Sequence, residues 1–121
     1  ILDYGGDAVE GSYHSAHYHP DVRSEKSIHL QNIYKQKYKR EIDNASLPLA
    51  YDAIMVLLDA IRRSGSLDRA KIRDTLAQTK GFQGATGNIT FDEHGDPQNK
   101  EVIIMKSGKK DQVYFETIKT D

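Results

Sequence analysis

Residues 49–63 read LAYDAIMVLLDAIRR, and this stretch decides what kind of fold the chain can form. Its apolar side chains are so dense that they cover nearly the whole circumference of a helix. Ser46 precedes it as a candidate N-cap, Pro48 falls in the first turn, where its missing N–H costs little, and Gly65 follows it as a stop. We therefore predict a helix from about Ser46 to Gly65 that requires packing neighbours on several sides.

Two further helices are predicted on either side of this segment. Over residues 24–40 apolar positions recur near helical spacing, and most of the basic side chains lie elsewhere on the wheel. A third helix is expected to start with Ser66 or Asp68 as its cap and to run to Lys80, with Gly81 as its stop. Both helices would bury one apolar stripe.

The rest of the chain has the pattern of short extended segments. Strands are expected at residues 11–18, 88–91, 101–106 and 112–118. Pro20 ends the first strand, and Gly95 can take positive φ in a turn over Asp92–Pro97. The last two strands would form a hairpin through Ser107–Asp111.

The predicted strands are too few and too short to cover the predicted helices. The strand at residues 11–18 has no obvious local partner, and a helix that is apolar all round has few strands to cover it. A strand beside an α/β crossover normally lies in a larger parallel sheet with both faces covered. We infer that the sheet is completed by residues outside this chain, from an upstream segment or from another chain.

Composition limits the function. A chain of 121 residues with 37% hydrophobic residues suits one domain and is too short for two complete ones. Its 17 basic and 18 acidic residues give a net charge of -1, so no overall field favours nucleic acid or an anionic membrane. The apolar run Ile54–Leu58 is far shorter than the roughly 20 residues of a membrane-spanning helix, so no membrane insertion is expected.

Cysteine is absent from the sequence. Its absence excludes disulfides, thiolate metal sites and a cysteine nucleophile. The chain opens at Ile1 with neither a methionine nor a targeting signal, and we expect that processing or truncation removed the original start.

Four phrases, in this order and at this spacing, resemble the last third of the branched-chain amino acid binding proteins. They are GDAVEGSYHSAHYHPD (Gly6–Asp21), LAYDAIMVLLDAI (Leu49–Ile61), GFQGATGNITFDEHGDP (Gly81–Pro97) and EVIIMKSGKKDQVYFETI (Glu101–Ile118). The most specific part is the run T-G-x-I-x-F-D-x-x-G-D between Thr86 and Asp96. The likeness extends over nearly all of the chain.

The resemblance implies an architecture. Receptors of this type I periplasmic binding class have two α/β lobes joined by three crossover segments. The chain would then be an α/β, Rossmann-like, three-layer lobe of the periplasmic-binding-protein-like I type, present only in part, with three helices and short strands. It would form a single incomplete domain over residues 1–121: a crossover strand at 1–20, the helical part of one lobe at 21–81, and a β-rich part at 82–121 that returns toward the other lobe.

The resemblance also implies a function. Such receptors are the solute-binding components of ABC importers, which close around an amino acid or similar small polar solute and present it to the permease subunits. They are periplasmic, or extracellular and membrane-anchored. They are not enzymes and need no cofactor. We expect that this chain, as the C-terminal portion of such a receptor, does not bind solute alone, and that its partner is the missing upstream portion or a second copy of the chain.

Two other functions remain open at this stage. A ligand-sensing regulatory module could have the same fold and signal to a partner protein. Alternatively, the chain could be a self-associating interaction domain that dimerises through its uncovered apolar helix surface.

One candidate ligand-binding residue follows from the resemblance. In such receptors the ligand's ammonium and carboxylate are held mainly by early loops and by an acidic residue that would precede this chain. Ser46 stands where relatives often present an aromatic side chain to the ligand, just ahead of the apolar helix. Here that side chain is a serine, and a helix cap is the alternative interpretation.

Other polar clusters have simpler interpretations. His14, His17 and His19 lie beside Asp21, but alternation along a strand lets only two of the imidazoles converge, so no metal site is expected. Asp92, Glu93 and Asp96 lack the order of a calcium loop and are interpreted as turn residues. The basic cluster over residues 35–40 is interpreted as the solvated face of a helix.

No catalytic motif is found in the sequence. It contains no G-x-S-x-G elbow, no G-x-x-x-x-G-K phosphate loop and no H-E-x-x-H zinc motif. Carboxylates such as Asp68 and Asp74 lie on a helix whose apolar stripe already explains their outward placement. We therefore predict a binding component without catalytic residues.

Overall fold

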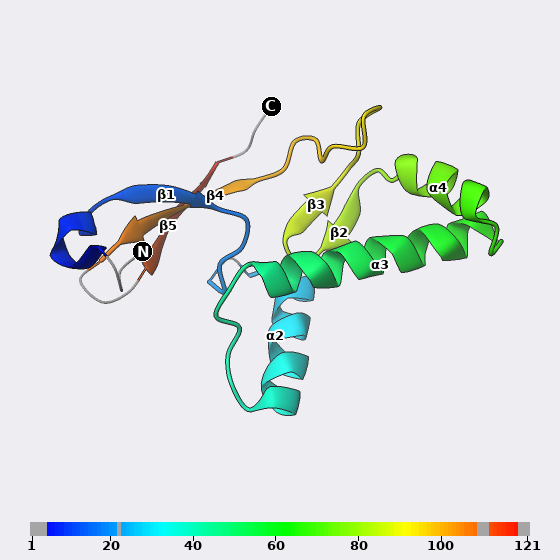
Figure 1. Ribbon diagram of the computed structural model, residues 1–121. Helices are drawn as coiled ribbons and strands as arrows, with labels where there is room; N and C mark the ends of the chain where they lie inside the picture. The colour runs from blue at the N-terminus through cyan, green and yellow to red at the C-terminus, as the bar shows by residue number, and fades with distance from the viewer. Residues whose placement is uncertain (1–4, 22, 109–111, 119–121) are drawn as a thin grey trace.

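The computed structural model describes residues 5–21, 23–108 and 112–118 and separates into a small sheet and a helical part (Figure 1). The elements are the 3-10 helix η1 (Gly6–Val9), β1 (Tyr13–Ala16), α2 (Glu25–Tyr38), α3 (Ser46–Ser64), α4 (Arg69–Ala77), β2 (Phe82–Gly84), β3 (Gly87–Ile89), β4 (Val102–Ser107) and β5 (Gln112–Ile118). Strands β1, β4 and β5 form one sheet, and β2 and β3 form a hairpin beside the helices.

Helix α3 begins where the sequence predicts, but its cap differs. The Asn44 side chain accepts a hydrogen bond from the Leu47 amide at 3.1 Å, while the N-cap residue itself makes no side-chain cap bond. Ser46 is the first helical residue, so its predicted role as N-cap is wrong. Pro48 lies in the first turn and Gly65 ends the helix with φ of 59°, both as predicted.

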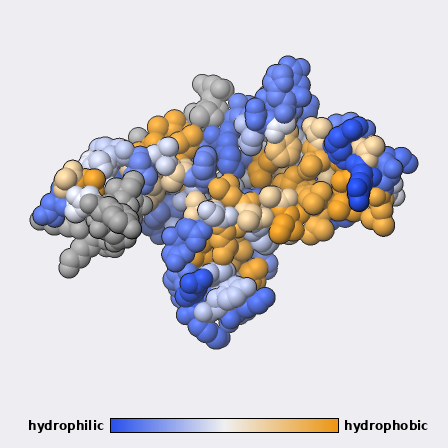
Figure 2. Space-filling model, viewed as in Figure 1, coloured by the Kyte–Doolittle hydropathy of each residue, from blue (hydrophilic) through white to orange (hydrophobic). Residues whose placement is uncertain are grey.

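The faces of α3 differ sharply in burial. A stripe with a spacing of four residues, formed by Pro48, Asp52, Val56 and Ala60, is buried. Ile54, Leu57 and Leu58 are 59%, 42% and 53% exposed. Figure 2 shows hydrophobic surface gathered along this helix. The described part of the chain therefore leaves open the additional faces that the sequence predicts to be covered.

Helix α2 starts as predicted and ends slightly earlier. The Ser24 side chain caps it by accepting a hydrogen bond from the Ser27 amide at 3.0 Å. Its last residue is Tyr38 rather than Arg40, because Lys39 takes the left-handed conformation with φ of 57°.

Helix α4 ends three residues before the predicted Lys80. Of the two proposed caps, Asp68 is the N-cap and accepts a hydrogen bond from the Lys71 amide at 3.0 Å. The helix stops at Ala77, and beyond it the Thr79 carbonyl accepts a hydrogen bond from the Phe91 amide at 3.1 Å. Gly81 therefore lies four residues beyond the last residue of the helix rather than at its stop.

The leading strand has a partner within the chain, which corrects the prediction from sequence. Strand β1 pairs antiparallel with β4, from Tyr13 opposite Lys106 to Ala16 opposite Ile103. It is also shorter than the predicted 11–18. The partner was missed because it lies near the other end of the chain, and local patterns carry no information on such pairing.

The predicted hairpin of β4 and β5 is confirmed by their antiparallel pairing. Its connection over residues 109–111 lies outside the described residues. Strand β2 was not predicted, and it pairs with β3, from Phe82 opposite Ile89 to Gly84 opposite Gly87. Phe91, placed in a strand by the sequence pattern, makes only an isolated bridge with Pro97.

The turn that follows this bridge is confirmed. The Asp92 carboxylate accepts hydrogen bonds from the His94 amide at 2.9 Å and the Asp96 amide at 2.8 Å. Gly95 has φ of 87°, which a side chain would disfavour. The carboxylate is therefore occupied in shaping the turn.

The core lies where α2, the start of α3 and the tip of the β2–β3 hairpin meet. Its buried cluster consists of Tyr18, Leu30, Tyr34, Ile42 and Ala85. Because Tyr18 enters from the segment after β1, this core fixes the path of the chain out of the sheet. In the part of the chain that the structure describes, no helix has the length and apolar character to span a membrane.

Arg63 connects the end of α3 to α4. Its guanidinium donates to the Asp59 carboxylate at 2.6 Å, to the Thr75 carbonyl at 3.2 Å and to the Thr79 hydroxyl at 2.9 Å. Hydrogen bonds from Arg63 and then from Arg62 hold the pKa of Asp59 below its ordinary value. The ionised form of Asp59 is therefore the form that favours the folded state.

This pKa shift makes the effect of replacing Asp59 depend on pH. A carboxyl whose pKa is lowered by folding stabilises the protein above its ordinary pKa of 3.8, and this contribution is lost as pH falls through the lower folded value. We expect Asp59→Asn to reduce the free energy of unfolding more at pH 7 than at about pH 3, as measured by urea titration. Asp74→Asn, which removes only a pair with the adjacent Arg73, is the control. An equal loss at both pH values would contradict the assignment.

Candidate functional site

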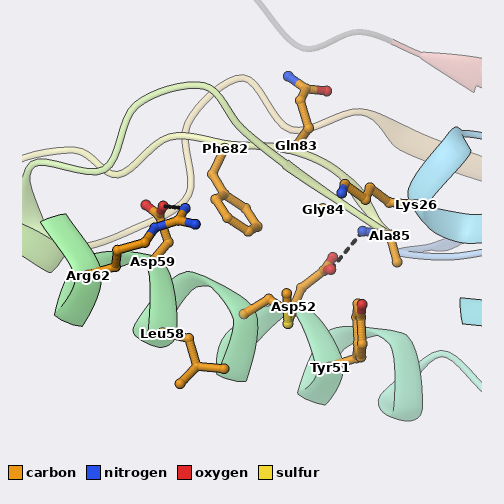
Figure 3. A pocket seen from close by; sticks show the side chains of 11 residues that line it. Lys26, Tyr51, Asp52, Leu58, Asp59, Arg62, Phe82, Gln83, Gly84 and Ala85 are labelled. Atoms are coloured by element: carbon orange, nitrogen blue, oxygen red, sulfur yellow. Dashed lines mark hydrogen bonds and ion pairs between the residues drawn. The ribbon is translucent and has the colours of Figure 1, made fainter. Parts of the chain in front are cut away.

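A cavity of about 380 Å³ lies between α3 and the β2–β3 hairpin (Figure 3). Phe82 points from β2 toward the helix, and Asp52 points from the helix toward the hairpin tip. Lys26 and Arg62 also line the cavity. The hairpin is therefore held above α3 by side chains from both elements.

The Asp52 carboxylate is the centre of this contact. It is 2% exposed and accepts three hydrogen bonds, from the Ala85 amide at 2.6 Å, the Thr86 amide at 2.8 Å and the Thr86 hydroxyl at 2.7 Å. Charge-assisted bonds of this kind are shorter and stronger than neutral ones. We call this arrangement of Asp52 with Ala85 and Thr86 the hairpin clamp.

Gly84 allows the close approach that the hairpin clamp needs. A Cβ atom at this position would lie 2.5 Å from an oxygen of Asp52. The carboxylate cannot withdraw without losing its hydrogen bonds to the two amides. A glycine is therefore required by space at this position, although its φ is not in the left-handed region.

Lys100 extends the hydrogen-bond network of the hairpin clamp. Its amine donates hydrogen bonds to the Thr86 hydroxyl at 2.8 Å and to the Thr86 carbonyl at 3.2 Å. Burial lowers the pKa of Lys100, and the nearby charge of Asp52 raises it. The amine and the carboxylate thus both contact the Thr86 hydroxyl, and their opposite charges partly offset each other's cost of burial.

The geometry favours a structural role for these groups. The oxygens of Asp52 face backbone amides and a hydroxyl instead of open solvent, so this carboxylate is positioned to hold a loop in place. Sequence reasoning missed it, although a signal was available: an ionisable residue inside the apolar stretch 49–63, on the same stripe as Pro48 and Val56. A buried carboxylate needs partners, and the hairpin supplies them.

Ser46, the ligand-binding residue predicted from the resemblance, lies apart from the clamp. It is exposed at the first turn of α3. Because Asn44 caps the helix, the Ser46 hydroxyl is not required for capping. Its role toward a ligand stays a prediction.

The structure does not bring the histidines together with Asp21 as a group of ligands. His19 Nδ1 accepts the Asp21 amide at 3.3 Å and lies 3.6 Å from the Asp21 carboxylate, while His17 is exposed. Among the described residues, no group of three or more histidine or carboxylate side chains is arranged to hold a metal ion.

The side chains of the basic cluster over residues 35–40 are exposed. Lys35 pairs with Glu41, and Arg40 donates a hydrogen bond to the Tyr34 hydroxyl at 3.1 Å. These contacts fit the predicted solvated helix face.

The clamp predicts that Gly84 tolerates no larger residue. Gly84→Ala should lower the free energy of unfolding by about 2 kcal/mol, because the new methyl group overlaps a carboxylate that cannot move freely. Urea unfolding measures the loss. Gln83→Ala, at an exposed position of the same strand, is the matched control and should change little. Equal free energies of unfolding for the two variants would contradict the close approach of Gly84 to the Asp52 carboxylate.

The fold defines a class of architecture, an α/β lobe attached to connecting strands, and the comparisons give its family. The chain belongs to the periplasmic binding protein family, whose model matches residues 1–112. A leucine-, isoleucine-, valine-, threonine- and alanine-binding protein of Pseudomonas aeruginosa is 31% identical over 81 residues, which are 67% of this chain. A Leu/Ile/Val-binding protein homologue of Brucella abortus is 26% identical over 106 residues, or 88% of the chain.

Solved structures agree with this assignment. A leucine-binding protein from Thermotoga maritima matches 97% of this chain with 40% identity and a TM-score of 0.84. A branched-chain amino acid transporter substrate-binding protein from Streptococcus pneumoniae, in complex with isoleucine, matches 89% with 28% identity and a TM-score of 0.77. The predicted fold class, a partial lobe of a type I periplasmic binding protein, is confirmed.

The match is to part of each relative. The chain spans 21% of the Pseudomonas protein and 28% of the Brucella protein. It spans 33% of the Thermotoga chain. The prediction that this chain corresponds to a portion of such a receptor is therefore confirmed.

Proposed function

We propose that this chain is part of the solute-binding component of an ABC importer, which captures an amino acid or similar small polar solute non-covalently between two lobes. The observation that carries the proposal is the likeness to the Thermotoga leucine-binding protein, with 40% identity over 97% of the chain and a TM-score of 0.84. The relatives named above are binding proteins, and no catalytic step is proposed.

The remaining portion of the receptor would cover the open faces of α3. Ile54, Leu57 and Leu58 are large and exposed, and burying such side chains stabilises a protein by about 1.5–3 kcal/mol each. The structures that match are about three times as long as this chain, since it spans 30–33% of the two reported. That additional length would supply the sheet strands and most of the ligand pocket, so the chain alone would not bind solute.

Within the receptor, this chain would provide part of one lobe and segments of the hinge. Residues 1–20 would form a crossover strand, residues 21–81 the helical part of one lobe, and residues 82–121 the β-rich part that returns toward the other lobe. Ser46 would face the ligand from the start of α3. Binding energy would come from charge-assisted hydrogen bonds that lobe closure shields from water.

The proposed receptor acts outside the cytoplasm. The family is periplasmic by its description, and we place this protein in the periplasm, or on the outer surface with a membrane anchor. There the closed, loaded receptor would be presented to ABC permease subunits.

A chimaera tests the proposal. In it, this chain replaces the matching 33% of the Thermotoga leucine-binding protein. We expect micromolar or tighter binding of leucine, isoleucine or valine by calorimetry, and no such binding by the isolated chain. Saturable micromolar binding by the isolated chain would contradict the proposal that most of the ligand pocket lies in the rest of the receptor. A folded chimaera that binds none of the three, with the parent receptor as positive control, would remove the amino-acid assignment.

The role of Ser46 can be separated from helix capping in the same chimaera. Ser46→Ala should weaken leucine binding about fivefold through the loss of one hydrogen bond and leave the melting temperature nearly unchanged. Asn44→Ala should lower the melting temperature, because it removes the cap bond to Leu47, and leave affinity nearly unchanged. The opposite pattern would show that Ser46 serves the helix and not the ligand.

A second candidate function is favoured by the open faces of α3. Ile54, Leu57 and Leu58 could cover each other in a second copy of this chain, which would make the chain a self-associating interaction domain. Sedimentation of the isolated chain distinguishes the cases, since a discrete dimer favours this function. A sensing role would instead be indicated by a signalling partner gene, rather than permease and ATPase genes, beside the coding sequence.

A further inference from the structure

Two chain segments connect the β1–β4–β5 sheet to the helical part. Residues 17–24 lead from β1 to α2, and residues 98–101 lead from the hairpin region to β4. Figure 1 shows the sheet extending away from the helices, with β1 and β4 side by side where they leave it. Any change in angle between the two parts must be absorbed near these segments.

The first segment is fixed by burial. Tyr18 is 7% exposed in the core cluster, and its hydroxyl accepts a hydrogen bond from the Ser27 hydroxyl at 3.4 Å. The Gln31 side chain donates to the Pro20 carbonyl at 3.1 Å. Both anchoring residues on the helical side belong to α2.

The second segment is fixed by polar contacts. The Gln98 amide donates to the Thr90 carbonyl at 2.7 Å, and the Lys100 amine donates to Thr86 at its hydroxyl and carbonyl. Thr86 is itself bonded to Asp52 of α3 in the hairpin clamp. Lys100, just before β4, is therefore connected to α3 through Thr86. The Lys100 side chain reaches back from the sheet side, only two positions before Val102 begins β4.

We propose that Lys100 is a positioning residue that sets how β4 leaves the helical part, and thereby how far the two lobes open and close around solute. The inference rests on the proposed function, because it assigns part of the hinge of that receptor to one side chain. Lys100 acts through Thr86 and the hairpin clamp, not by touching the ligand.

The physical reason is the cost of leaving the partners of Lys100 unsatisfied. Without the amine, the Thr86 carbonyl loses a donor and the buried Asp52 carboxylate loses a nearby positive charge. The hairpin tip and the segment over residues 98–101 are then less tightly coupled, and the unliganded receptor samples a wider range of lobe angles. When the unliganded receptor samples more lobe angles, closure around the ligand removes more conformational entropy. Ligand binding is then weaker.

The test uses the full-length chimaera with Lys100→Met, which keeps the apolar stem and removes the amine. One fluorophore on each lobe reports the distance distribution without ligand, and calorimetry reports leucine affinity. We expect a broader distribution and a dissociation constant raised about five- to tenfold. Lys106→Met is the matched control, because this exposed lysine lies on β4 and faces the Tyr13 ring.

A merely structural role would lower stability without changing the lobe distribution. Thr86→Val, combined with Lys100→Met in a double-mutant cycle, separates the two because it removes the hydroxyl that Lys100 contacts. Non-additive effects on distribution width support the proposal. Equal distributions for Lys100→Met and Lys106→Met overturn it, whatever happens to stability.

The distance distribution needs no ligand, so it also separates this inference from the proposed function. If the chimaera binds no leucine, but its distance distribution broadens on Lys100→Met, the hinge role of Lys100 is supported and the assignment of an amino-acid ligand is rejected. Should Lys100→Met fail to fold, Lys100→Gln, which removes the positive charge and leaves the bonds of Thr86 to Asp52 in place, gives the same reading: a broader distance distribution supports the proposal, and an unchanged width overturns it.

Discussion

The position of the hairpin depends on the buried carboxylate of Asp52. An ionised group with 2% exposure is costly unless it is fully hydrogen-bonded, and two backbone amides and a hydroxyl of the hairpin meet that requirement. The hairpin tip contributes Ala85 to the apolar core, so the hydrogen bonds to Asp52 also hold this part of the core in place. The close approach then dictates glycine at position 84.

Local features were predictable from the sequence because their causes are local. The three helices follow from apolar spacing and end signals, and the turn at Asp92 follows from aspartate and glycine at fixed offsets. The errors at the helix ends concern details of capping: α3 is capped by the Asn44 side chain, one position before its N-cap residue, and α4 ends at Ala77, before the Thr79 carbonyl bonds to the Phe91 amide.

Non-local features were not predictable from one sequence. The pairing of β1 with β4 and the clamp between α3 and the hairpin join segments far apart in the chain. Asp52 could have been singled out by its place on the stripe with Pro48 and Val56, but nothing in the sequence names its partners. The same limit applies to Lys100, which stands in a polar segment whose pattern is that of an ordinary surface loop.

The pairing of β1 with β4 has a consequence for the order of folding. Helices α2 to α4 and the hairpin are contiguous in sequence and can form as soon as they are synthesised, whereas β1 must wait for strands at the other end. Closing so long a loop costs entropy before any contact repays it. The sheet should therefore assemble last, and until it does β1 presents unpaired edges that a neighbouring nascent chain could capture.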